Sequence, residues 1–235
     1  FLLCAVCVFG MIPTQAFAFS PGQKASSWLG DQYVGSDGHH YYSPAPYTYL
    51  VYNSDGTMDV RTSSGGSAYR HYMLTVSDGS SHQVYCVESG IPYNTSDNTY
   101  TSESGTNSQY LNLLPAEARR GITLTAIYGW KPGASLPVSG INEDDYKMAT
   151  QIILWEYQQQ LRSDPYSRHG NGHASADQYY SVIAGRPAEK AYNWILKQVA
   201  SHSTVPSFTS SSKDGAPELE LKWDSEQRVY TLTVT

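Results

Sequence analysis

The sequence contains one cysteine, Cys86, outside its first 18 residues. A thiol at such a position has four chemical uses: an intermolecular disulfide, burial as a small apolar side chain, a catalytic nucleophile, or a covalent bond to an atom other than sulfur. A catalytic thiol needs a neighbouring base that raises its thiolate fraction. Seven histidines could supply this base, but none lies in a cysteine peptidase signature, so the four uses remain open from the residue types alone.

Other candidate sites are weaker. His169 and His173 flank "GNG", which predicts a loop rather than a helix that could present both rings to a metal, and no third ligand is near. Asp144 and Asp145 begin a predicted helix, where carboxylates complement the helix dipole. The sequence has no nucleophile elbow, phosphate loop or dinucleotide fingerprint. We therefore expect no metal and no cofactor.

Two short motifs narrow the choice for Cys86. "YCV" at 85–87 places an aromatic residue before the cysteine, and "TQIILW" at 150–155 places Thr-Gln before a tryptophan within a predicted helix. Together they resemble the two signatures of the thioester domains of Gram-positive bacterial surface adhesins. Ile153, where many members have a small residue, and Glu156, where an apolar residue is usual, differ from the family pattern. Both differences concern packing rather than the atoms that form the bond.

The resemblance implies that the sulfur of Cys86 is acylated by the side-chain carbonyl of Gln151, with loss of ammonia. A thioester carbonyl stays electrophilic because sulfur is a poorer resonance donor than nitrogen. The bond can form only if folding holds the two side chains at attack distance. By the same resemblance, Thr150 hydrogen-bonds near the thioester, Trp155 packs against it and shields it from water, and Tyr85 supports the cysteine.

The function implied by the resemblance is covalent adhesion to a host, a virulence trait. A lysine amine on a host surface or matrix protein attacks the thioester, Cys86 leaves as the thiol, and an amide joins Gln151 to the partner in one event without turnover. We expect a monomer held at the cell wall through regions outside this sequence. Two alternatives remain: a carbohydrate- or protein-binding β module that uses its tyrosines, and a thiol peptidase or acyltransferase.

The N-terminus indicates export. Residues 1–18 form an apolar run that ends in Ala16-Phe17-Ala18, the pattern of a signal peptide and its cleavage site, without an initial methionine or basic region. No later segment approaches the roughly 18 apolar residues of a membrane span. The formal charge of −6, with 15% charged residues, argues against a nucleic-acid surface. The 20 tyrosines, against 5 phenylalanines, are typical of exposed strands and loops on secreted proteins.

The first part of the chain predicts an antiparallel sheet. Alternating apolar and polar residues, separated by Asp-Gly and Gly-Gly turns, predict strands at 47–53, 57–62, 69–76 and 82–88. The polar stretch 94–109 predicts a surface loop.

Helices are predicted at 113–130, 142–161 and 187–202. The second is the clearest, because Asn142 can cap it and Ala149, Ile152 and Ile153 form an apolar stripe. Gln151 lies off this stripe, at an edge shared with Lys147 and Leu154.

Strands, then helices, then strands give an α+β class. We expect an antiparallel sandwich or barrel-like subdomain and a helical subdomain, with the thioester at their interface. The predicted domains are the signal peptide at 1–18, a thioester domain at 19–212, and a terminal β hairpin or the start of a following β domain at 213–235. In that last segment Lys222 could take part in an isopeptide bond with a partner beyond the sequence.

Overall fold

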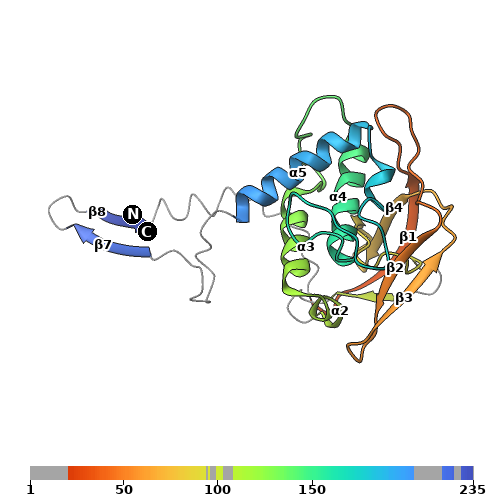
Figure 1. The fold of residues 1–235 in the computed structure, drawn as a ribbon, viewed down its shortest axis with the longest axis horizontal. Coiled ribbons are helices and arrows are strands. Elements are labelled where there is room, and N and C mark those ends of the chain that lie inside the picture. The colour runs from red at the N-terminus through yellow and green to blue at the C-terminus, as the bar shows by residue number, and fades with distance from the viewer. Residues whose placement is uncertain are drawn as a thin grey trace.

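The computed structural model describes residues 21–93, 95, 99–102, 108–203, 219–224 and 229–234. The predicted signal peptide therefore lies outside the described residues, as does most of the predicted surface loop. The order of the elements confirms the α+β class, with antiparallel sheets followed by a group of helices (Figure 1).

The main sheet has four strands in the order β5-β4-β1-β6. These are β1 (Lys24–Gln32), β4 (Arg70–Val76), β5 (Ser81–Val84) and β6 (Thr99–Thr101). All three pairings are antiparallel, and the β1–β4 register shifts between Leu29 and Gln32, where β1 carries one extra residue. Strands β2 (Tyr47–Tyr52) and β3 (Met58–Ser63) form a separate two-stranded ladder.

Three strand predictions differ from the structure. Strand β6 lies within the stretch 94–109 that was predicted as a surface loop, and it pairs with β1. Strand β1 is missing from the prediction because its buried positions are small residues, Ala25 and Ser27, which give no hydrophobic alternation. The strand predicted at 82–88 is too long, since β5 ends at Val84. Cys86 therefore lies just beyond the strand, where the backbone is free to turn toward the helices.

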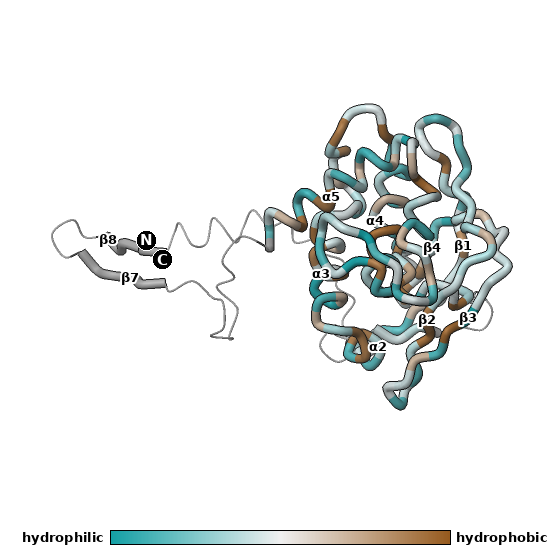
Figure 2. Tube along the Cα trace, in the orientation of Figure 1, coloured by the Kyte–Doolittle hydropathy of each residue, from teal (hydrophilic) through white to brown (hydrophobic). Residues whose placement is uncertain are grey.

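The helices are α2 (Gln109–Leu113), α3 (Ala116–Tyr128), α4 (Glu143–Gln158) and α5 (Pro187–Ser203), with a short 3-10 helix, η1 (Tyr180–Val182). The three predicted helices are confirmed, with α2 as an additional turn before α3. Hydrophobic and hydrophilic residues alternate along α5 in Figure 2, as expected for a helix with one face in the core.

Helix α4 is the centre of the fold. It contacts α3 and α5, and Figure 1 shows it between these helices and the strands. Every residue from Asp145 to Gln158 is buried, so the predicted stripe described only part of a helix that is covered all round. Gly121 of α3 permits this packing, because a side chain there would overlap the ring of Tyr157.

The two departures from the family pattern are both accommodated around α4. Ile153 is fully buried in the core. The carboxylate of Glu156, also fully buried, accepts hydrogen bonds from Nε of Arg162 at 2.9 Å and from the hydroxyl of Tyr192 at 2.7 Å. A buried charge needs such partners.

Among the described residues, the C-terminal strands β7 (Leu219–Asp224) and β8 (Val229–Val234) pair with each other in an antiparallel ladder. The two strands predicted in this segment are therefore present as one two-stranded ladder. Whether it belongs to the preceding domain stays a prediction, and so does the role suggested for Lys222. None of the helices in the described part of the chain has the length and apolar character needed to cross a membrane.

Candidate functional site at the contact of Cys86 and Gln151

Cys86 and Gln151 are in direct contact. The side-chain oxygen Oε1 of Gln151 accepts a hydrogen bond from the backbone N–H of Cys86 at 2.9 Å, and Nε2 of Gln151 donates to the backbone oxygen of Cys86 at 2.6 Å. Gln151 is fully buried. The amide of Gln151 thus pairs with both backbone groups of the cysteine, as a neighbouring strand would.

The sulfur of Cys86 is held within its own turn, where it donates to the backbone oxygen of Glu88 at 3.4 Å. Burial is the main cause that raises the pKa of the thiol from its ordinary value of 9.0 to about 11. The backbone near Glu88 and the indole of Trp155 act in the opposite direction but more weakly. The thiol is therefore protonated at neutral pH, unlike the low-pKa thiols of cysteine enzymes.

The N-terminus of α4 is tied to the chain that follows β1. The carboxylate of Asp144 accepts from the backbone N–H of Val34 at 3.0 Å, and that of Asp145 accepts from the backbone N–H of Ser36 at 3.0 Å. Asp145 also forms the capping box with Asn142. The two carboxylates lie in the first turn of α4 as predicted, and they also fix the position of α4 against the β part.

Tyr85 and Thr150, the residues directly before Cys86 and Gln151, hold the same residue in the α3–α4 connection. The hydroxyl of Tyr85 donates to the backbone oxygen of Trp130 at 2.8 Å, and the backbone N–H of Trp130 donates to Oγ1 of Thr150 at 2.9 Å. We call these two hydrogen bonds the Trp130 clamp. Gly129 completes it, since a side chain there would overlap Thr150.

The clamp gives Tyr85 and Thr150 a common structural task. It links the two sequence motifs through one rigid residue, so that the segment carrying Cys86 and the helix carrying Gln151 are fixed relative to each other. The other hydrogen bond of Thr150 is within α4, to the backbone oxygen of Tyr146 at 2.8 Å. Direct hydrogen bonding of Thr150 to the thioester stays a prediction.

Trp155 stands on the other side of Cys86. Its ring packs against those of Tyr69 and Tyr179, each with a centroid distance of 5.4 Å, and only 4% of the residue is exposed. Its buried indole N–H makes no close hydrogen bond within the described part of the chain, although it faces Cys86 closely enough to lower the pKa of the thiol. That Trp155 shields a thioester from water stays a prediction.

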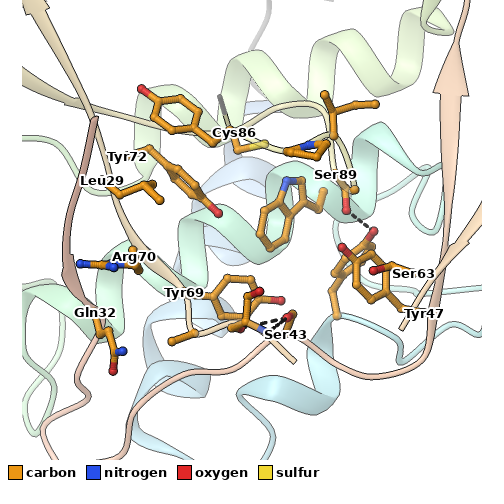
Figure 3. Close-up of a pocket in the computed structure, with 18 residues that line it drawn as sticks. Leu29, Gln32, Ser43, Tyr47, Ser63, Tyr69, Arg70, Tyr72, Cys86 and Ser89 are labelled. Carbon is orange, nitrogen blue, oxygen red and sulfur yellow. Dashed lines mark hydrogen bonds between the residues drawn. The ribbon is translucent and has the colours of Figure 1, made fainter. Parts of the chain in front are cut away.

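Cys86 and Trp155 line a pocket of ≈ 560 Å³ (Figure 3). Its wall is formed by β1, β4, the ends of β2 and β3, and the segment 86–93. Among the residues that the structure describes, no histidine and no carboxylate lines this pocket. The aromatic residues of the wall are Tyr47, Tyr69, Tyr72, Tyr93, Trp155 and Tyr179.

The sequence analysis did not identify Trp130 or the tyrosines of the pocket. The clamp uses backbone atoms of Trp130, which leave no signal in a sequence. The tyrosines come from separate segments of a chain with 20 tyrosines, so their type alone could not single them out.

At His169 and His173 the sequence predicts a loop rather than a metal site. His169 and His173 lie in the irregular segment between α4 and η1, and the described residues hold no group of three or more potential metal ligands.

Comparison with known proteins assigns the family. A family model described as the thioester domain matches residues 83–201, half of the chain, and this range includes the contact between Cys86 and Gln151. No curated protein and no solved structure matched. The chain belongs to the thioester domain family.

Proposed function

We propose that Cys86 and Gln151 form an internal thioester, which then joins the protein covalently to an amine on a partner. The observation that carries this proposal is the pair of hydrogen bonds between the Gln151 amide and the Cys86 backbone, at 2.9 and 2.6 Å. They hold the carbonyl carbon of a fully buried glutamine beside the cysteine. Such fixed orientation replaces most of the entropic cost of bringing two groups together.

In the first step, the sulfur of Cys86 attacks Cδ of Gln151. The C–S bond forms, the C–N bond breaks, and the thiol proton leaves with the nitrogen as ammonia. Negative charge develops on Oε1 during the attack. The backbone N–H of Cys86, which donates to Oε1, is placed to stabilise this charge in the manner of an oxyanion hole.

In the second step, a neutral amine attacks the same carbon. The new C–N bond forms, the C–S bond breaks, and the proton lost by the amine is taken by the sulfur, which regenerates the thiol. The raised pKa of Cys86, about 11, makes departure as a bare thiolate unfavourable. Departure of the sulfur is therefore coupled to the transfer of the proton that the attacking amine loses.

The partner class follows from the pocket and the family. A pocket without carboxylates disfavours a charged ammonium and so favours the neutral, nucleophilic form of a lysine side chain. We propose a lysine of a host surface or matrix protein as the target, and attachment of an exported surface adhesin as the purpose. A covalent amide has no ordinary dissociation rate, which suits a surface protein under shear.

The intact mass of the purified protein tests the proposal. A formed thioester lowers the mass by one ammonia molecule and blocks alkylation of Cys86. Methylamine should then add one methylamine molecule and release an alkylatable thiol. Cys86→Ala and Gln151→Ala should show neither change, whereas Gln160→Ala, a control just beyond α4, should behave as the wild type. If the wild type had the mass of the unmodified chain and its Cys86 were freely alkylated, the proposal would be refuted.

The two alternatives predict different results. A thiol enzyme needs turnover and a base, but its thiolate would be scarce here and no histidine lies among the described residues of the pocket wall. A reversible binding module would use the tyrosines of the pocket, and its binding would survive Cys86→Ala unchanged.

A further inference from the structure

The pocket beside Cys86 has one positive charge. Arg70 is the single charged residue among the described residues that line it, while the chain as a whole carries a formal charge of −6. The rest of the wall consists of aromatic, aliphatic and uncharged polar residues. In such surroundings a single cation dominates the local electrostatic potential.

The structure holds Arg70 in place without neutralising it. Arg70 begins β4 and pairs with Gln32 across the bulge in β1, and its Nε donates to the backbone oxygen of Gly30 in that bulge at 2.8 Å. Within the part of the chain that the structure describes, no carboxylate forms an ion pair with it. A guanidinium has five N–H donors, so most of its donors are available to a ligand.

Arg70 lies at the end of the sheet from which the chain runs on to Cys86. The β4–β5 ladder ends at the pair Tyr72 and Val84, so Arg70 begins β4 two residues before Tyr72 and Cys86 follows β5 two residues after Val84. Residues two apart on a strand point to the same face. In Figure 3 the ring of Tyr72 lies between Cys86 and Arg70, and Leu29 and Gln32 stand beside Arg70.

We propose that Arg70 makes the pocket selective for a lysine that has an acidic side chain close to it in the partner protein. This inference rests on the proposed function, because it assumes a thioester at Cys86. The carboxylate of the partner pairs with the free N–H groups of Arg70, while the neighbouring lysine reaches the thioester. Charge-assisted pairing of this kind is geometrically specific, and the same guanidinium repels segments rich in lysine and arginine.

The test uses short peptides that each contain one lysine, with glutamate, glutamine or arginine placed in turn at neighbouring positions. The rate of covalent adduct formation is measured by intact mass and divided by the methylamine rate of the same variant. At low salt the best glutamate peptide should react about five- to tenfold faster than its glutamine counterpart, and the advantage should shrink as salt rises. Arg70→Glu should reverse the order and favour the arginine peptide.

Arg61→Glu is the matched control, because it makes the same charge change at an exposed residue of β3 that does not line the pocket. It should keep the preference for glutamate. Arg70→Gln, which retains a donor for Gly30, should abolish the preference if Arg70→Glu does not fold.

Two results would overturn the inference. Equal rates for glutamate and glutamine peptides in a wild type that reacts with methylamine would refute the role of Arg70 and leave the thioester intact. A wild type that does not react with methylamine would refute the thioester itself, and the inference with it.

Discussion

Two of the buried polar side chains of helix α4 have opposite kinds of partner. Gln151 and Glu156 are both fully buried. Gln151 is neutral and pairs only with the backbone of Cys86, whereas Glu156 is bound by the guanidinium of Arg162 and the hydroxyl of Tyr192. Burial lowers the pKa of Arg162, but Glu156 together with Tyr192 more than offsets this, so the net shift is upward and the guanidinium stays charged. Burial also raises the pKa of Glu156, and Arg162 and Tyr192 act against that rise.

A buried ion pair and a buried neutral amide therefore allow different chemistry. A buried ion pair satisfies its charges only in one arrangement, so it fixes α4 to the segment 159–162 and to α5 but has no group left to react. A neutral amide can be buried with two hydrogen bonds and still present its carbonyl carbon to a sulfur. The first site stabilises the helix, and the second uses the resulting rigidity.

Breaking the ion pair should have the largest effect on stability. Arg162→Ala leaves the Glu156 carboxylate buried without its charge partner, which should lower the free energy of unfolding by about 3–5 kcal/mol. Gln151→Ala should cost less, about 1–3 kcal/mol, yet abolish the proposed crosslink. Urea unfolding measures both values.

Two further variants check this ranking. Arg61→Ala removes an exposed pair with Asp59 and should change stability by no more than about 1 kcal/mol. Replacing both Glu156 and Arg162 by methionine should recover much of the loss from Arg162→Ala, because no unpaired charge remains. If Arg162→Ala lowered the free energy of unfolding as little as Arg61→Ala, the ion pair would not be what fixes α4 in place.

The next effect concerns the pH dependence of the Cys86 thiol in Gln151→Ala, in which a thioester cannot form. A pKa near 11 instead of 9.0 leaves about 100-fold less thiolate at neutral pH. In the folded protein, the rate of alkylation by iodoacetamide should therefore still rise tenfold per pH unit at about pH 10. At the same pH, the rate for the chain unfolded in urea should already have levelled off. A folded-state plateau below pH 9.0 would contradict the burial of the sulfur.

The raised pKa of Cys86 also determines how the stability of this variant changes with pH. Between pH 9.0 and about 11 the folded state of this variant binds the thiol proton more tightly than the unfolded state. The contribution of Cys86 to the free energy of unfolding is thus complete below pH 9.0 and is lost as the pH rises through this range.

A smaller effect on stability than that of the ion pair is expected at the Trp130 clamp. Tyr85→Phe and Thr150→Val each remove one hydrogen bond to the backbone of Trp130 and should cost about 1–3 kcal/mol. Both should also slow formation of the thioester, measured as the mass fraction that has lost ammonia after refolding. Tyr166→Phe alters a tyrosine that is 81% exposed and should change neither quantity. A thioester that forms at the wild-type rate in both clamp variants would show that the clamp does not position the reactive pair.

Much of the helical part could be predicted from sequence. The cap at Asn142, the acidic first turn and the apolar positions of 142–161 are local features, and local features set where a helix begins and which residues it contains. The limits of the strands were less predictable. Strand β1 buries small residues, and β5 stops two residues before Cys86 although the alternation continues.

The sequence by itself was enough to single out the candidate pair. Cys86 and Gln151 stand out because a single cysteine after an aromatic residue and a Thr-Gln in a strong helix are rare in combination, and the family model covers both. Only the tertiary structure decided how they meet: the pairing of the Gln151 amide with the Cys86 backbone, the clamp on Trp130 and the position of Arg70 in the pocket. The physical reason is that these contacts depend on backbone atoms and on residues far apart in the chain, which are brought together by burial of α4 and not by any local pattern.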